Sequence, residues 1–302
     1  NENESLTFDE FQKNRLIIAN RLAAIYGDSS GEIDEFGYPL GYGKNNQSVL
    51  IPAFISAYSG KDPNSISLSA IRSTPLPNWS LQYSGLINLD FFKDRFKRFS
   101  IGHSYRSSYT LNSFKSNLEY NSETPSLKDA SGNFLNEILY TNINLVEQFN
   151  PLLKIDMELK NSIRLVMALK KDRALSLSLD NDMLTETSGT DYSLGFGYRI
   201  KDLKFRNNLG GRQTVSKGDL NIKADVNFRD NITIIRNLNI LDNKVTAGQT
   251  LWSLKLSADY ALSKSFNAVF FYDHLFSKFA ISTAFPMTTI RSGMTLRYNF
   301  GD

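Results

Sequence analysis

The chain has 302 residues and a formal net charge of +3, from 34 Lys and Arg against 31 Asp and Glu. This near balance excludes the basic field that a nucleic-acid-binding protein presents to phosphates, so we expect no nucleic-acid partner. The absence of cysteine excludes disulfides, thiolate metal sites and thiol nucleophiles. With 41% hydrophobic residues, the chain can bury a core as one large β-barrel or as two ordinary domains.

The sequence shows neither a membrane-spanning helix nor a signal peptide. The longest apolar helical stretch, Leu16–Tyr26, is interrupted by Asn20 and Arg21 and falls short of the roughly 20 residues that cross a bilayer as a helix. Residues Asn1–Ser5 contain no basic segment followed by an apolar one. If the protein is exported, we expect the chain to be a mature form or a piece of a longer protein.

Residues 1–77 are predicted to form a region of helices and loops. Thr7 and Glu10 have the spacing of a capping box, and an amphipathic helix is expected from Phe8 to Tyr26. A second short helix is expected over Val49–Tyr58, and the prolines of Ser73–Trp79 mark a change of architecture. The predicted buried face of the first helix consists of Phe11, Ile18, Leu22, Ile25 and Tyr26.

Residues 78–302 alternate between apolar and polar side chains with a period of two, which indicates β-strands with one apolar and one wet face. About ten strands fit this template, and an outer-membrane β-barrel is the architecture that it favours. A soluble β-sandwich also alternates and remains the alternative fold. We predict lipid-facing side chains at Leu220, Ile222, Val226, Leu254, Leu256 and Phe270. The lumen-facing candidates are Asn221, Lys223, Asp225, Asn227, Lys255, Asp259 and Arg297.

The last strand carries aromatic residues on its outward positions, as the assembly signal and interface girdle of an outer-membrane barrel require. We assign this signal to Gly293, Leu296, Tyr298 and Phe300. We expect the strand to pair with a first barrel strand or with another chain, because an unpaired strand edge is not tolerated in lipid.

The expected connections alternate between short inner turns and longer outer loops, as outer-membrane barrels require. The outer loops are predicted at 180–190, 236–248 and 277–289, and the inner turns at 160–162 and 263–265. An unusually long inner connection at 201–218 departs from this rule. Lys171 and Arg173 occupy positions where the alternation requires apolar side chains. The chain there either turns or continues as a strand at the membrane interface.

Motifs for catalysis are absent, so we predict that the protein is not an enzyme and needs no cofactor or metal. His103 and His274 lie in strand-like stretches without metal-ligand spacing. The glycines of Gly41–Gly43 and Gly195–Gly197 do not extend into a nucleotide-binding fingerprint. A hydrolase built from Ser, His and Asn in a barrel wall is the enzymatic alternative, but no spacing supports it.

An ordered series of segments along nearly the whole chain resembles the C-terminal part of the SprA (Sov) family, the outer-membrane translocons of the type IX secretion system in Bacteroidetes. The series is more specific than any single segment. Its members are Asn14–Ile18, Gly41–Phe54, Ala57–Pro63, Pro75–Trp79, Glu147–Phe149, Lys170–Arg173, Arg229–Asn231, Ile234–Arg236 and Leu256–Tyr260.

This resemblance implies a wall segment of a very large antiparallel transmembrane β-barrel in the outer membrane of a Gram-negative bacterium. It also implies that residues 1–77 pack at one mouth of the pore. The implied function is passage of folded cargo, linked to gliding motility. The implied partners are the remainder of the SprA-like barrel, a PorV-like shuttle barrel, a periplasmic plug protein, secreted cargo and outer-membrane lipid. Family members are far longer than 302 residues. An autonomous barrel of about ten to twelve strands, a porin or an adhesin, is the alternative function.

Overall fold

The computed structural model describes residues 4–26, 31–72, 75–209, 212–240, 242–261, 266–281, 285–298 and 300, with 205–209 and 212–216 described by their backbone. The helices are α1 (Leu6–Tyr26), α2 (Gln47–Ser59) and α3 (Asp90–Arg95), with a 3-10 turn η1 (Gly85–Asn88) before α3. The strands are β1 (Trp79–Tyr83), β2 (Phe96–Ser116), β3 (Ile138–Leu159), β4 (Ile163–Ser178), β5 (Met183–Leu209), β6 (Arg212–Asn237), β7 (Asn243–Ala261), β8 (Phe266–Phe279) and β9 (Met287–Tyr298).

The nine strands form one antiparallel sheet in which each strand pairs with its neighbours in the sequence, in the order β1 to β9. Most of the connections are short, which favours pairing of consecutive strands, because antiparallel neighbours need only a turn between them. The prediction of an antiparallel β chain with an N-terminal helical region is confirmed. Within the described residues the sheet is open, with β1 and β9 at its edges.

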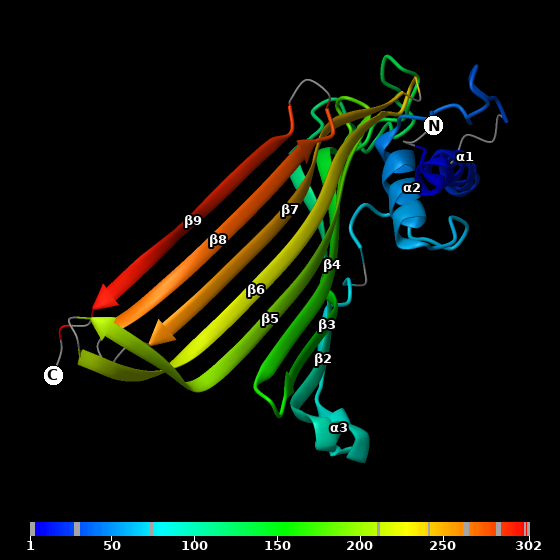
Figure 1. Cartoon of the computed structure of the whole chain (residues 1–302). Coiled ribbons are helices and arrows are strands. Elements are labelled where there is room, and N and C mark those ends of the chain that lie inside the picture. Colours follow the sequence, from blue (N-terminus) through cyan, green and yellow to red (C-terminus); the bar gives the residue numbers. More distant parts are fainter. Residues whose placement is uncertain are drawn as a thin grey trace.

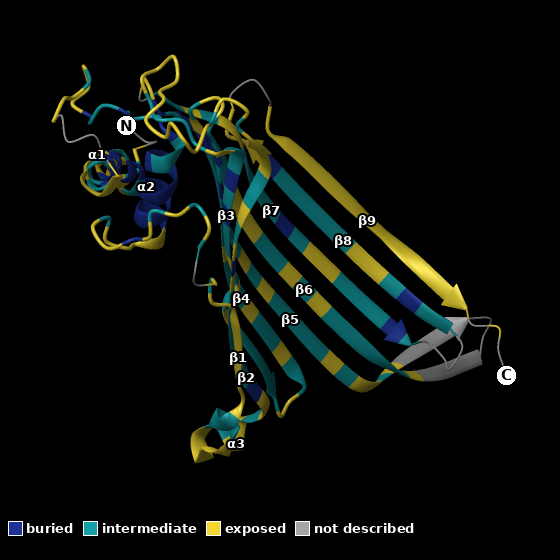
Figure 2. Ribbon diagram, turned by 180° about the vertical axis from the view of Figure 1, so that it is seen from behind, coloured by how far each residue is buried: buried dark blue, intermediate teal, exposed yellow. Residues whose placement is uncertain are grey.

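The helical region lies against one side of the sheet, near the end where β9 begins, and α3 lies at the opposite end (Figure 1). Helix α2 is apolar on all sides and is buried from Val49 to Tyr58 (Figure 2). Its ends are well defined: the Asn46 side chain accepts a hydrogen bond from the N–H of Ser48, and Gly60 adopts the left-handed conformation after the last turn. A helix buried all round needs cover on every side, which α1 and the sheet supply.

Helix α1 buries Phe8, Phe11, Ile18 and Leu22 against α2, broadly as its amphipathic pattern predicts. Asn14 is buried as well, because its side-chain amide donates to Ser56 Oγ on α2 at 3.1 Å. Three details of the helix differ from the prediction. Ile25 and Tyr26 are exposed rather than buried, and the N–H of Phe8 is capped by Ser5 Oγ at 3.3 Å rather than by the Thr7 side chain.

The strands extend further than the alternation of apolar side chains predicts. Residues 201–218, expected as a long inner connection, continue β5 and β6 as a hairpin whose described strands end at Leu209 and begin at Arg212. The outer loops expected at 180–190 and 236–248 are largely strand, and the backbone leaves only 179–182 and 238–242 between the strands. The alternation of side chains does not predict these strand ends, because a strand can stay hydrogen-bonded to its neighbour beyond the apolar band without apolar side chains. The predicted inner turn at 263–265 lies outside the described residues.

Helix packing gives a test of this core. Replacing the fully buried Phe54 by Ala should destabilise the helical region by about 3–5 kcal/mol, the typical cost of removing a large aromatic side chain from a core. Hydrogen exchange over α1 and α2 measures the loss. Leu16→Ala, at a position 39% exposed on α1, is the matched control and should cost much less. Equal effects of the two substitutions would contradict the packing described.

Candidate functional site: a two-faced wall with open edges

The sheet places apolar side chains on one face and polar side chains on the other. Residues that pair across neighbouring strands point to the same face, so the two sets stay separate from strand to strand. Ile222 on β6 lies opposite Tyr198 on β5 and Ala258 on β7, and these side chains share one face, which we call the apolar face. All six residues predicted to face lipid lie on it: Leu220, Ile222, Val226, Leu254, Leu256 and Phe270.

The other face, which we call the polar face, carries all seven residues predicted to face a lumen. Asn221 lies opposite Asp259, and Asp225 lies opposite Lys255. The structure therefore brings each set together on its own face, and which face meets lipid stays a prediction. The members of the polar set are Asn221, Lys223, Asp225, Asn227, Lys255, Asp259 and Arg297.

The exposed part of the apolar face has the height of a membrane. On β6 every second side chain from Leu220 to Phe228 is apolar, and Asp230 interrupts the series before Ile232 and Ile234 resume it under the helical region. Nine strand residues extend about 30 Å, and a tilt of about 40° reduces this to about 23 Å, near the roughly 25 Å apolar band of outer-membrane barrels. On this face Leu194 is 45% exposed, Phe270 52% and Leu296 54%. Large side chains this exposed, side by side over several strands, form a surface that calls for an apolar neighbour.

The helical region covers the rest of the apolar face, at the end where β9 begins. Ile143 and Leu145 of β3 and Leu175 and Leu177 of β4 belong to one buried core with α1 and α2. The hydroxyl of Tyr109 on β2 donates to the carbonyl of Ala70 at 2.9 Å, which fixes the segment after α2 on this face. The helices therefore lie on the same side of the wall as the exposed apolar band.

Two ion pairs lie on the apolar face where the helices cover it. Glu147 of β3 binds Arg173 of β4, and the Arg173 guanidinium also donates to the carbonyl of Tyr58 on α2 at 3.3 Å. Strand β4 therefore continues through Arg173, and the alternative of a turn at 170–173 is wrong. Burial raises the pKa of the Tyr58 hydroxyl beside this pair.

The second covered pair joins Glu186 of β5 to Arg236 of β6 at 3.0 Å, and the guanidinium lies 5.3 Å from the centre of the Phe8 ring on α1. The Arg236 side chain is only 3% exposed. Removing a charge from water is costly unless an opposite charge pairs with it. Each covered pair therefore stabilises both the contact between its two strands and the packing of a helix on the sheet. The alternation of apolar and polar residues could not identify the four charged residues of the two covered pairs, because they stand at positions where it predicts apolar side chains.

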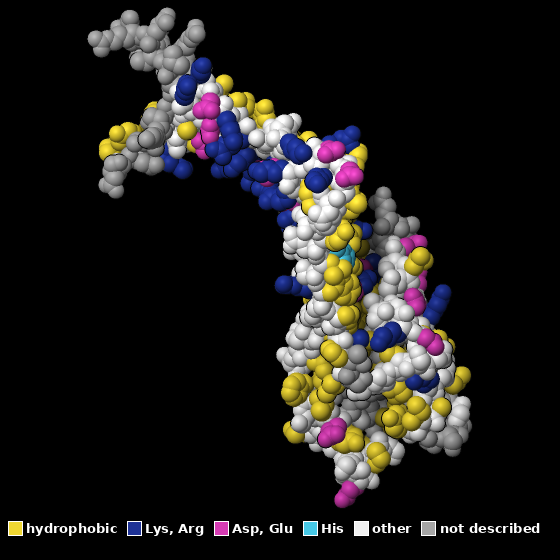
Figure 3. Space-filling model, turned by 90° about the horizontal axis from the view of Figure 1, so that it is seen from below, with side chains coloured by type: hydrophobic (Ala, Val, Ile, Leu, Met, Phe, Trp, Pro, Cys, Tyr) yellow, Lys and Arg dark blue, Asp and Glu magenta, His cyan; other side chains and the backbone are white. Residues whose placement is uncertain are grey.

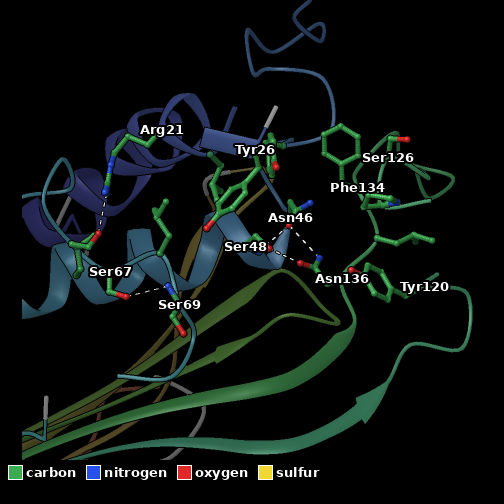
Figure 4. A pocket seen from close by; sticks show the side chains of 16 residues that line it. Arg21, Tyr26, Asn46, Ser48, Ser67, Ser69, Tyr120, Ser126, Phe134 and Asn136 are labelled. Atoms are coloured by element: carbon green, nitrogen blue, oxygen red, sulfur yellow. Dashed lines mark hydrogen bonds between the residues drawn. The ribbon is translucent and has the colours of Figure 1, made fainter. Parts of the chain in front are cut away.

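A hollow of about 1,080 Å³ opens between α1, the start of α2 and the connection from β2 to β3 (Figure 4). Its wall is a network in which Ser48 Oγ donates to Asn136 Oδ1 at 2.5 Å and Asn136 in turn donates to Asn46. Arg21 closes the other side by donating to the carbonyl of Ile66 at 3.1 Å. The bonds between Ser48, Asn136 and Asn46 hold the β2–β3 connection against the start of α2.

The two histidines lie in strands, as predicted. His103 Nδ1 lies 2.6 Å from the carbonyl oxygen of Leu152, and its ring contacts Trp79 and Phe149. The described part of the chain holds no group of three or more His, Cys, Asp or Glu side chains arranged for a metal ion. Its helices are too short or too polar to cross a bilayer. A scan against family models and a search of curated proteins found no match to this chain.

The edge strands complete the site. Every residue of β1 and of β9 is exposed, and Figure 2 shows β9 yellow along its length. Among the predicted assembly-signal residues, Leu296 and Tyr298 share the apolar face, Gly293 lies on the polar face opposite Phe271, and Phe300 follows the strand and is 93% exposed. Their role in assembly stays a prediction.

The covered ion pairs give a second test. Arg236→Met leaves the Glu186 carboxylate without this partner in a covered site, which should destabilise the fold by about 3–5 kcal/mol. Chemical denaturation followed by near-ultraviolet circular dichroism measures the change. The double variant Glu186→Leu/Arg236→Met should recover most of the loss, because neither charge is then buried. A double variant as unstable as the single one would show that the pair itself is not responsible.

Proposed function

We propose that this chain is a wall segment of a protein-conducting channel in a Gram-negative outer membrane, of the kind that the type IX secretion system uses. The observation that carries the proposal is the combination of an apolar band of membrane height on one face with a polar opposite face and two open edges. A soluble sandwich would cover that band with a second sheet. In the described residues the helical region covers only the part of the apolar face beyond the band.

In this proposal the apolar face meets lipid and the polar face lines a water-filled lumen. Cations and carboxylates alternate on the polar face, as in the pairs Arg229 with Asp191 and Arg291 with Asp273. A wall of mixed charge lets a folded protein pass without strong attraction over most of its area. The chemistry of the site is passage rather than bond making, in line with the prediction that the chain is not an enzyme.

Loop lengths orient the segment. The longest described connection between strands, 117–137, lies at the same end of the sheet as the helical region, whereas the turn at the other end of β3 spans only 160–162. Outer-membrane barrels keep short turns in the periplasm and long loops outside. The helical region therefore belongs at the outer mouth, on the lipid side of the wall rather than inside the pore.

The open edges favour a large assembly over an autonomous porin or adhesin. Closure of a barrel abolishes its edges, and single-chain bacterial barrels have an even number of strands, whereas the described sheet is open and has nine. The remainder of a SprA-like barrel is the partner that we propose for β1 and β9. A PorV-like shuttle, a periplasmic plug and secreted cargo complete the proposed set of partners in the Bacteroidetes outer membrane.

The facing of the wall is tested by a matched pair of substitutions on β6. Ile222→Lys puts a charge on the proposed lipid face and should impair membrane insertion by roughly 2–4 kcal/mol, whereas Lys223→Glu on the proposed wet face should insert normally. Fractionation of outer membranes and protease protection report the inserted fraction. Equal tolerance of the two variants would contradict the assignment of the faces.

The terminal strand is tested by truncation. Deletion of Met294–Asp302 removes the second half of β9 and the proposed assembly signal, so the truncated chain should fail to reach the outer membrane. The level of protein in outer-membrane fractions measures this, with Lys278→Ala as a control for a change outside the removed segment. Normal insertion of the truncated chain would show that β9 is not the assembly strand.

A further inference from the structure

One stretch of the β2 edge has no strand beside it in the described part of the chain. Strand β1 pairs with β2 only from Ile101 to Tyr105, whereas β2 continues to Ser116. The N–H of Ser107 donates to the side chain of Asn78 at 2.6 Å, so Ser107 points its backbone groups away from β3. Beyond the end of β1, the outer edge of β2 is therefore open to a further strand.

Tyr109 and Leu111 continue this open edge. The register with β3 is unbroken from Tyr105 to Asn112, and every second residue of an antiparallel strand points its N–H and C=O to the same side. Tyr109 and Leu111 therefore share the outward direction of Ser107. Among the described residues, neither has a backbone hydrogen-bond partner on that side. Two donors and two acceptors thus stand in the pattern that an added strand requires.

A hollow of about 530 Å³ lies beside these backbone groups. On one side it is lined by residues 107–111 of β2. On the other side it is lined by the segment that leads into β1, through Ile71, Arg72, Pro75, Leu76 and Asn78. The Ile71 side chain is 64% exposed. The segment therefore passes the open edge at a distance and leaves room for a ligand between the two.

Arg72 supplies a cation to this hollow. Within the described residues its side chain has neither an ion pair nor a hydrogen bond, and its Nε atom is buried without a partner. Asp62, which lines a neighbouring hollow with Arg72, instead accepts from the backbone and side chain of Asn64. A buried donor without a partner costs free energy. A carboxylate that binds a guanidinium with both oxygens accepts from two of its nitrogens, so an acidic ligand would satisfy Arg72.

Arg72 lies apart from the cations of the wall. Lys and Arg side chains gather on the inner side of the bent sheet, as Figure 3 shows. The hydroxyl of Tyr109 instead fixes Ala70, two residues before Arg72, on the apolar face. Arg106 of β2 belongs to the polar face, because it stands an odd number of residues from Tyr109 in an unbroken strand. The two arginines therefore lie near the same edge but on opposite faces.

We propose that the open edge of β2 at Tyr109 and Leu111, with Arg72 beside it, binds an extended peptide segment that carries a carboxylate. The peptide adds to the sheet as a strand through its backbone. Its carboxylate, from an acidic side chain or from its C-terminus, binds the Arg72 guanidinium. Main-chain hydrogen bonds supply affinity, and the arginine selects acidic segments.

This site goes beyond the proposed function. A strand of the remaining barrel that pairs with β1 lies one strand further out than β1, about 10 Å from β2. It therefore leaves the place next to Tyr109 and Leu111 open. The peptide site needs only the edge and Arg72, and it does not depend on which face of the wall meets lipid.

The first test uses the full chain, purified from outer membranes in an uncharged detergent, and the peptide Thr-Val-Glu-Val-Thr with an amidated C-terminus. Hydrogen exchange at the amides of Tyr109 and Leu111, followed by mass spectrometry, should be fast in the free chain. Saturating peptide should slow it at least about tenfold, because both amides then donate to the added strand. The same peptide with every backbone nitrogen methylated is the control and should give no protection.

The second test measures the affinity of the fluorescein-labelled peptide by fluorescence anisotropy. Arg72→Gln should weaken binding about tenfold, because a hydrogen bond between charged groups is lost. Replacing the Glu of the peptide by Gln should cost about the same, and Arg72→Gln should then add little. Arg106→Gln is the matched control on the other face and should stay within about twofold. A peptide Thr-Val-Thr-Val-Thr with a free C-terminus, compared with its amide, shows whether a terminal carboxylate serves as well.

Other results would overturn the inference. Slow exchange at Tyr109 and Leu111 without any peptide would show that another strand already occupies the edge. Equal binding of the methylated peptide would show that no strand is added, and equal losses from Arg72→Gln and Arg106→Gln would indicate general attraction. Normal outer-membrane insertion of a chain that binds no peptide would reject this inference and leave the proposed function standing.

Discussion

The main constraint on the structure is that the backbone N–H and C=O groups at the edges of the sheet need hydrogen-bond partners. Strand β9 has 12 residues, and about half of its backbone N–H and C=O groups point away from β8. In hydrocarbon each such group without a partner costs several kcal/mol, so an open edge of this length cannot face lipid by itself. In the membrane that we propose, an exposed apolar band therefore requires strands on both sides of the wall. The proposed larger barrel would meet this requirement.

The helical region solves a second problem of the same sheet. Strands β3 to β6 continue past the apolar band, and there they carry Glu147, Arg173, Glu186 and Arg236 on the apolar face. These charges would be out of place in lipid, and the helices cover them with backbone and aromatic contacts. The covered pairs therefore mark one limit of the exposed apolar band, and α1 and α2 lie on the apolar face beyond it.

Sequence periodicity predicted the strands well where one face is apolar. Leu220 to Phe228 and Leu254 to Tyr260 alternate strictly, and the register places both runs as predicted. The same periodicity failed at 201–218, because paired strand in water needs no apolar parity. The short helix α3 was missed because six residues are too few to show a helical pattern.

Native purification of the tagged chain from outer membranes in mild detergent, with sizing and mass spectrometry of the proteins that accompany it, tests the central claim most directly. The account predicts a particle far larger than 34.2 kDa that contains the rest of a SprA-like polypeptide and a PorV-like barrel. Recovery of a small detergent-bound monomer would contradict it, because β1 and β9 would then have to satisfy each other within a single chain.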